Sequence, residues 1–121
     1  MIACIDSDVL IDYFDGLEEA AVELNRYPRI MISRINWMEV LIGVDDPKLR
    51  ELRERFLADF EVVELDLKIA REAIHLRNTH RLKLPDAIVW ATARCREALL
   101  VSRNSKDFPN EDPSVRIPYK I

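Results

Sequence analysis

The sequence predicts an α/β protein in which a mostly parallel sheet of about four to five strands lies between two layers of helices. Short apolar segments alternate along the chain with longer segments whose apolar residues recur at helical spacing, and the connections are short. The 121 residues contain no internal repeat, low-complexity stretch or linker. We therefore expect a single domain over residues 1–121, built as a three-layer α/β/α sandwich.

The composition is typical of a soluble globular protein. Hydrophobic residues make up 49% and charged residues 33% of the chain, and no apolar run approaches a membrane span. The N-terminus lacks the basic segment followed by an apolar one that marks a secretory signal. Cys4 and Cys95 lie in apolar surroundings, which is typical of core residues rather than of a disulfide or metal pair. We expect a cytoplasmic protein with no membrane contact.

The net charge of −4 is unevenly distributed along the chain. The part up to Asp66 is strongly acidic, and the part after it is basic. Such a split occurs in proteins with a nucleic-acid-binding face, but ordinary solvated helix faces also produce it, and composition leaves both interpretations open.

The first expected strand covers residues 2–5 and is followed directly by Asp6-Ser7-Asp8. Ligands of open α/β sheets bind beyond the carboxyl ends of the strands, so Asp6 is well placed for chemistry. The structural alternative is that Ser7 or Asp8 caps a helix over residues 9–14 and that Asp6 is a turn residue.

The next helix and strand lead to an unusual carboxylate. A helix over residues 17–27 precedes a second strand at 29–32, and Ser33 is a good N-cap for a helix over 34–44. That helix is apolar almost all round, yet Glu39 stands in its middle. Unpaired burial of a carboxylate costs several kcal/mol, so Glu39 must be solvated by a cleft, paired, protonated or bound to a cation.

The middle of the chain reads as ordinary structure. Asp46-Pro47 is an N-cap followed by proline at the first helical position, and it opens an amphipathic helix. Residues 61–65 form a third strand, and Asp66 caps the helix after it.

The last third of the chain again places polar residues beside buried elements. Leu84-Pro85 opens a buried helix with Asp86 in its first turn, where this side chain can simply complement the helix dipole. A fourth strand at residues 99–101 closes on the polar turn 102–107, and a short strand at 114–117 follows.

Four separate elements thus deliver acids to expected sheet-edge positions: Asp6, Glu39, Asp86 and the turn ending at Asp107. Two carboxylates about 4 Å apart repel each other by about 4 kcal/mol at an effective dielectric near 20, so a cation must lie between them. Oxygen-only ligands suit Mg²⁺ or Mn²⁺. The sequence contains no pattern of zinc ligands, because the cysteines are isolated and the two histidines, five positions apart, do not share a helix face.

Four motifs follow one another along the chain. They are Asp6-Ser7-Asp8-Val9-Leu10-Ile11-Asp12; Ser33 with Glu39-Val40-Leu41 and Gly43; Leu84-Pro85-Asp86-Ala87 with Ala91-Thr92-Ala93; and Val101-Ser102-Arg103-Asn104 with Asp107-Phe108. In these motifs the chain resembles the PIN-domain family, particularly its VapC-type toxin ribonucleases, and the resemblance covers essentially the whole chain.

The resemblance implies a metal-dependent endoribonuclease that acts as the toxin of a toxin–antitoxin pair. Its cofactor would be Mg²⁺ or Mn²⁺, held by Asp6, Asp86 and Asp107. Glu39 and Asn104 complete the implied catalytic set. The implied partners are an RNA substrate, a cognate antitoxin and a second copy in a homodimer. Among the basic residues, the expected phosphate contacts are Arg81, Lys83, Arg103 and Lys106.

Two positions depart from the family pattern. Asp8 stands where the family commonly has Asn, which adds a negative charge beside the site. An acid often occupies the place of Asn104, so the fourth carboxylate is interpreted as Asp107, with Asn104 as a neutral ligand or water-orienting group.

Two other functions remain open. Asp6-Ser7-Asp8 also fits the first motif of haloacid-dehalogenase-type phosphatases, although the chain lacks their late glycine-rich acidic motif, Gly16 and Gly43 being its only glycines. The neutral Asn104 also allows a PIN-like partner-binding module that no longer cuts RNA.

Overall fold

A computed structural model describes residues 1–121 and contains one sheet of five strands, all parallel, in the order β3-β2-β1-β4-β5. Their bounds are β1 Ile2–Ile5, β2 Arg29–Ser33, β3 Glu61–Val63, β4 Leu99–Val101 and β5 Val115–Arg116. The predicted α/β class and parallel sheet are confirmed. The central strand is β1, which pairs with both β2 and β4.

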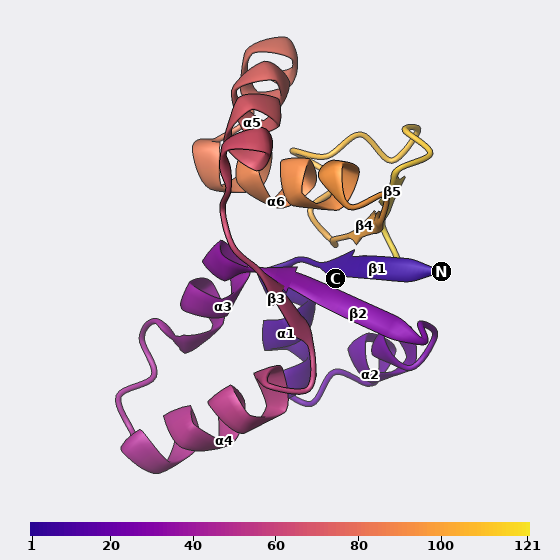
Figure 1. The fold of residues 1–121 in the computed structure, drawn as a ribbon. Helices are drawn as coiled ribbons and strands as arrows, with labels where there is room; N and C mark the ends of the chain where they lie inside the picture. Colours follow the sequence, from indigo (N-terminus) through magenta and orange to yellow (C-terminus); the bar gives the residue numbers. More distant parts are fainter.

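Six helices cover the two faces of the sheet (Figure 1). On one face lie α5 and α6, at the top of Figure 1, and the other four helices lie below the sheet. The bounds are α1 Ser7–Phe14, α2 Glu18–Leu24, α3 Arg34–Leu41, α4 Pro47–Leu57, α5 Leu67–His80 and α6 Leu84–Cys95. The order of strands and helices along the chain is the predicted one.

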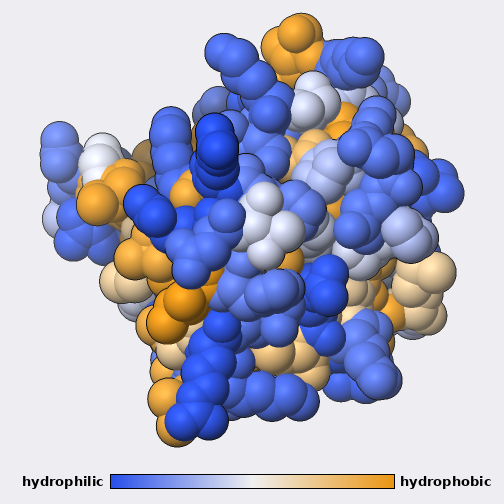
Figure 2. All heavy atoms as spheres, turned by 90° about the horizontal axis from the view of Figure 1, so that it is seen from above, coloured by the Kyte–Doolittle hydropathy of each residue, from blue (hydrophilic) through white to orange (hydrophobic).

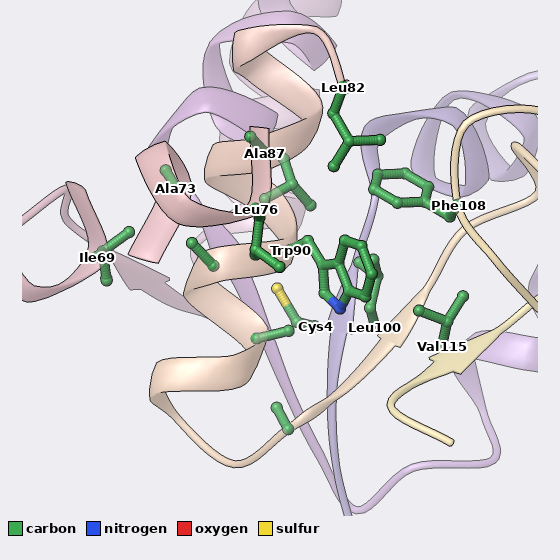
Figure 3. Close-up of a cluster of buried hydrophobic side chains, with 14 of the residues drawn as sticks. Cys4, Ile69, Ala73, Leu76, Leu82, Ala87, Trp90, Leu100, Phe108 and Val115 are labelled. Carbon is green, nitrogen blue, oxygen red and sulfur yellow. The ribbon is translucent and has the colours of Figure 1, made fainter. Parts of the chain in front are cut away.

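The sheet separates two apolar cores, because successive side chains of a strand point to opposite faces. Cys4 of β1 packs in the core beneath α5 and α6, whereas Ala3 and Ile5 belong to the core on the other face. Figure 3 shows the first core gathered around Trp90, whose indole N–H donates to Ser114 Oγ at 3.2 Å. Both cysteines are free, with Cys4 buried and Cys95 partly buried.

The predicted caps mark the helix starts. The side chains of Ser33, Asp46 and Asp66 each accept a hydrogen bond from a backbone N–H in the first turn of α3, α4 and α5. The end of α3 was predicted wrongly. The helix stops at Leu41 rather than at residue 44, because Ile42 is extended and Gly43 adopts φ +81°.

The outer surface carries mostly polar side chains. Seen from the side of α5 and α6, hydrophilic residues predominate and hydrophobic ones occur in smaller groups (Figure 2). None of the helices combines the length and apolar character that crossing a bilayer requires.

Candidate active site

The site lies where the order of the strands reverses. From β1 the chain moves to β2 and β3 on one side, and it later returns to β4 and β5 on the other. The crevice beyond the carboxyl ends of two such strands is the usual ligand site of open α/β sheets. Asp6 follows β1 and the turn 102–107 follows β4, and the backbone N–H of Asp6 donates to Val101 O at 2.9 Å.

Asp6 also forms the start of α1. The N-cap is Asp6 itself, not Ser7 or Asp8 as in the structural alternative considered from the sequence. Its Oδ1 accepts hydrogen bonds from Ser7 N at 2.8 Å and Asn36 Nδ2 at 3.2 Å, and its Oδ2 accepts one from Ser102 Oγ at 2.8 Å. Three elements therefore hold one buried carboxylate.

Glu39 reaches this group through Ser7. The Ser7 hydroxyl donates to Glu39 Oε1 at 2.9 Å and lies 3.5 Å from Asp6 Oδ1. Since Asn36 and Glu39 are three residues apart on α3, they share the side of the helix that faces Asp6. The carboxylate that interrupts the apolar pattern of α3 is thus turned toward the end of β1.

Asp86 is partly buried in the first turn of α6. Its pKa is raised to about 6, chiefly by burial and also by the nearby carboxylates of Asp107 and Glu39, while the charge of Lys83 opposes the rise. A hydrogen bond with Asp107 also favours the protonated carboxyl group. Asp86 is therefore near both the acid of the last turn and the acid of α3.

Asn104 and Asp107 form one unit in the turn after β4. Asn104 Nδ2 donates to Asp107 Oδ2 at 2.9 Å, and Asp107 N donates back to Asn104 Oδ1 at 3.2 Å. Phe108, next in sequence, is buried in the core around Trp90 and donates its backbone N–H to Asn104 O. The turn is therefore anchored from both sides.

The departure at Asp8 adds to the crowding of charge. Burial raises the pKa of Asp6 to about 7, and the charges of Asp8 and Asp86 contribute, against hydrogen bonds from Ser102 and Ser7. Burial also raises the pKa of Asp8, which shares the Ser102 hydroxyl with Asp6. Ionised acids therefore repel one another at this edge of the sheet.

The side chains as they stand are linked acids rather than a formed metal site. No group of three or more His, Cys, Asp and Glu side chains is close enough together to hold one metal ion. The acids lie instead as two pairs, Asp6 with Asp8 and Asp86 with Asp107, and Glu39 joins the first pair through Ser7. All their donor atoms are oxygens, which fits Mg²⁺ or Mn²⁺ in chemistry.

The four predicted phosphate contacts differ in their surroundings. Arg103 is engaged in a bidentate ion pair with the buried Asp12, with its Nε and one terminal nitrogen at 2.5 and 3.2 Å from the two carboxylate oxygens. Arg81, Lys83 and Lys106 are exposed and form no ion pair in the structure.

The sequence reasoning missed three polar residues at this edge: Ser7, Asn36 and Ser102. Two signals pointed to them. Asn36 precedes Glu39 by three positions, which places both on one helix face, and Ser102 directly follows a buried strand. That Ser102 meets Asp6 depends on the pairing of β4 with β1, which the order of elements along the chain does not reveal.

Comparisons with known proteins bear on the family and the fold of this chain. The family model described as PIN domain matches residues 3–110. A solved toxin–antitoxin complex from Klebsiella pneumoniae contains a chain 38% identical to this one, with a TM-score of 0.93 over 98% of this chain and 99% of that chain. No curated protein sequence matches the chain.

Two more distant structures share the fold. The first is VapBC2 from Rickettsia felis bound to a promoter DNA fragment, with 20% identity and a TM-score of 0.78 over 95% of this chain and 96% of that chain. The second is FitAcB from Neisseria gonorrhoeae, with 18% identity and a TM-score of 0.77 over 100% of both chains.

Proposed function

Because the chain belongs to the PIN domain family, a family of nucleases, we propose that it is a metal-dependent endoribonuclease and the toxin of a toxin–antitoxin pair. One observation carries the proposal. Four separate elements bring Asp6, Glu39, Asp86 and Asp107 to the carboxyl edge of the sheet, where burial and like charge raise the pKa of two of them. Perturbed acids in such a crevice are typical of catalytic sites.

The acids take different parts in the proposed reaction. Asp6, Asp86 and Asp107, which form no single metal-binding group as they stand, would have to draw together to hold Mg²⁺ or Mn²⁺. The ion would lower the pKa of a bound water and polarise the phosphoryl oxygen. Asn104 holds Asp107 in place through their two hydrogen bonds. Ser7 donates to Oε1 of Glu39, so Oε2 would be the freer oxygen to accept a hydrogen bond from the attacking water and orient it.

RNA is expected to reach the acidic crevice through contacts with exposed cations at its rim. Lys83 is close enough to Asp86 for its charge to oppose the rise of the Asp86 pKa. Arg81 and Lys106 are exposed and lie close to site residues in the sequence. Arg103 is assigned a structural part, because its guanidinium is bound to Asp12. The phosphate-binding set proposed is therefore Arg81, Lys83 and Lys106.

The proposed partners are a cognate antitoxin and a second copy of the chain, in the cytoplasm. The relative from Klebsiella pneumoniae was solved as a toxin–antitoxin complex. Exposed apolar side chains on and between α3 and α4 support a protein contact there, since such groups of residues mark interaction sites. They are Met38, Ile42, Leu49 and Leu52.

Cleavage assays with the purified protein test the proposed activity. The wild type is expected to cut RNA with Mn²⁺ and to stop when EDTA removes the metal, and Asp6→Asn is expected to abolish cleavage. The matched control is Glu97→Gln, an exposed acid at the opposite edge of the sheet, before β4. A wild type that binds an antitoxin but cuts no RNA with Mn²⁺ would contradict the proposal and favour a partner-binding module.

A further inference from the structure

We propose that Asn36 is a positioning residue of this site, whose side-chain amide fixes the orientation of the Asp6 carboxylate. The inference rests on the proposed function, in which Asp6 is a metal ligand. It concerns a residue on α3 that the acidic motifs do not include.

The contacts of Asn36 join the ends of two neighbouring strands. Its side chain is completely buried. Oδ1 accepts the backbone N–H of Ser33 at 3.2 Å, and Nδ2 donates to Asp6 Oδ1 at 3.2 Å. The orientation of the amide follows from its partners, because a backbone N–H can only donate and an ionised carboxylate can only accept.

A rigid element holds the amide in place. Ser33 and Asn36 form a capping box, in which the Ser33 hydroxyl accepts from Ile35 N at 3.1 Å while the Asn36 amide binds the Ser33 backbone. The start of α3 is thereby fixed to the end of β2, which lies beside β1 in the sheet. Asn36 passes this fixed geometry on to Asp6.

The consequence is a choice between the two oxygens of Asp6. A carboxylate oxygen has two lone pairs, and Oδ1 receives two N–H donors, from Ser7 and Asn36. Oδ2 receives only the Ser102 hydroxyl and keeps one lone pair. We therefore assign Oδ2 as the atom of Asp6 that meets a cation, and Asn36 as the residue that keeps Oδ1 turned away.

Manganese binding to the purified protein tests this role without relying on activity. Free Mn²⁺ is measured by electron paramagnetic resonance during titration of the wild type, Asn36→Ala, Ser33→Ala, Asp6→Asn and the double variant Asn36→Ala/Asp6→Asn. Loss of groups that orient metal ligands typically weakens metal binding by roughly 10- to 100-fold, and we expect this of Asn36→Ala. Ser33→Ala, which damages the same helix cap without touching Asp6, should stay within about twofold of the wild type.

The double variant separates positioning from folding. If Asn36 acts through Asp6, adding Asn36→Ala to Asp6→Asn should weaken Mn²⁺ binding no further. In RNA cleavage Asn36→Ala should lower kcat and leave KM nearly unchanged. Circular dichroism checks the fold of each variant, and Asn36→Leu, which keeps the number and branching of the side-chain heavy atoms, gives the same comparison if the alanine variant unfolds.

Each adverse result identifies what fails. A wild type that binds no Mn²⁺ contradicts the proposed function and the role of Asn36 with it. Wild-type affinity in Asn36→Ala overturns the positioning role alone, and so does an equal loss in Asn36→Ala and Ser33→Ala, which would make Asn36 a helix cap only.

Discussion

Asp86 shows at the scale of one residue how the metal-free site works against stability. Its pKa is raised from 3.8 to about 6, first by burial and then by Asp107 and Glu39. The folded protein thus binds this proton more tightly than the unfolded chain does. Stability contributed by the protonated group is therefore lost as the pH rises from about 4 through 6.

We expect Asp86→Asn to be as stable as the wild type, or slightly more stable, at neutral pH without metal, because one repulsive charge is gone. The wild type should gain stability with Mn²⁺, by about 2.7 kcal/mol at a hundredfold excess over Kd. Asp86→Asn should lose most of this gain, together with cleavage activity. Calorimetry with and without Mn²⁺ measures both effects. An equal metal-induced shift in the two proteins would place the ion elsewhere.

The residue scale also shows what a single carboxylate can reveal in a sequence. Glu39 stands out in the sequence because it interrupts the apolar pattern of a helix. In the structure it is turned toward Asp6 through Ser7. Asp8 was noticed as a departure from the family, and it does add charge beside Asp6. Asn36 gives only a weak signal, its place on the same helix face as Glu39, because a buried amide within a helix has many possible partners.

At the scale of elements, the pair of Arg103 and Asp12 joins α1 to the turn after β4. Asp12 also accepts the Tyr119 hydroxyl at 2.8 Å, so the C-terminal segment takes part. The backbone N–H of Arg103 donates to Asp8 Oδ1 at 3.4 Å. Arg103 is thus part of the support of the site.

Arg103→Ala and Lys83→Ala should therefore behave differently. Arg103→Ala leaves the buried Asp12 without its charged partner and should lower the free energy of unfolding by about 2 kcal/mol. Lys83→Ala should leave stability unchanged, weaken RNA binding and reduce the slope of log K against log salt by about 0.7 to 1. Urea denaturation and binding titrations at several salt concentrations measure the two effects. A similar reduction of the salt slope in Arg103→Ala would show that Arg103 contacts RNA.

A second pair joins α2 to β5. Glu23 is buried and accepts two hydrogen bonds from Arg116, at 2.7 and 3.1 Å, and one from Tyr27. Burial by itself raises the pKa of Glu23, but the hydrogen bonds from Arg116 and Tyr27 outweigh it and the pKa is lowered. Stability from this group is present above its unfolded value of 4.5 and is lost as the pH falls through the lower folded value.

Glu23→Gln should lower the free energy of unfolding by about 2 kcal/mol at neutral pH, as loss of charged hydrogen bonds does. The difference from the wild type should shrink as the pH falls below 4.5, where Glu23 itself becomes protonated. Denaturation curves at pH 3 to 7 measure it, with Glu19→Gln as the control on the exposed side of α2. A difference that stays constant with pH would assign the effect to packing rather than to charge.

At the scale of the whole molecule, the chain order of strands and helices was readable from the sequence, and their arrangement across the sheet was not. The caps at Ser33, Asp46 and Asp66 were predicted because each side chain acts on the turn that follows it. The contact of Ser102 with Asp6 depends on strands at opposite ends of the sequence lying side by side. That the acids gather at one edge was expected from the elements that carry them, and their separate roles were implied by the family resemblance.

The place of β1 between β2 and β4 has a consequence for folding during synthesis of the chain. Translation produces Asp6 well before β4, Asn104 and Asp107. The crevice can form only after β4 has been made and has paired with β1. The proposed nuclease would therefore be inactive toward the messenger and ribosome that produce it until β4 and the turn 102–107 have been made, and chains that end before this turn would not be toxic.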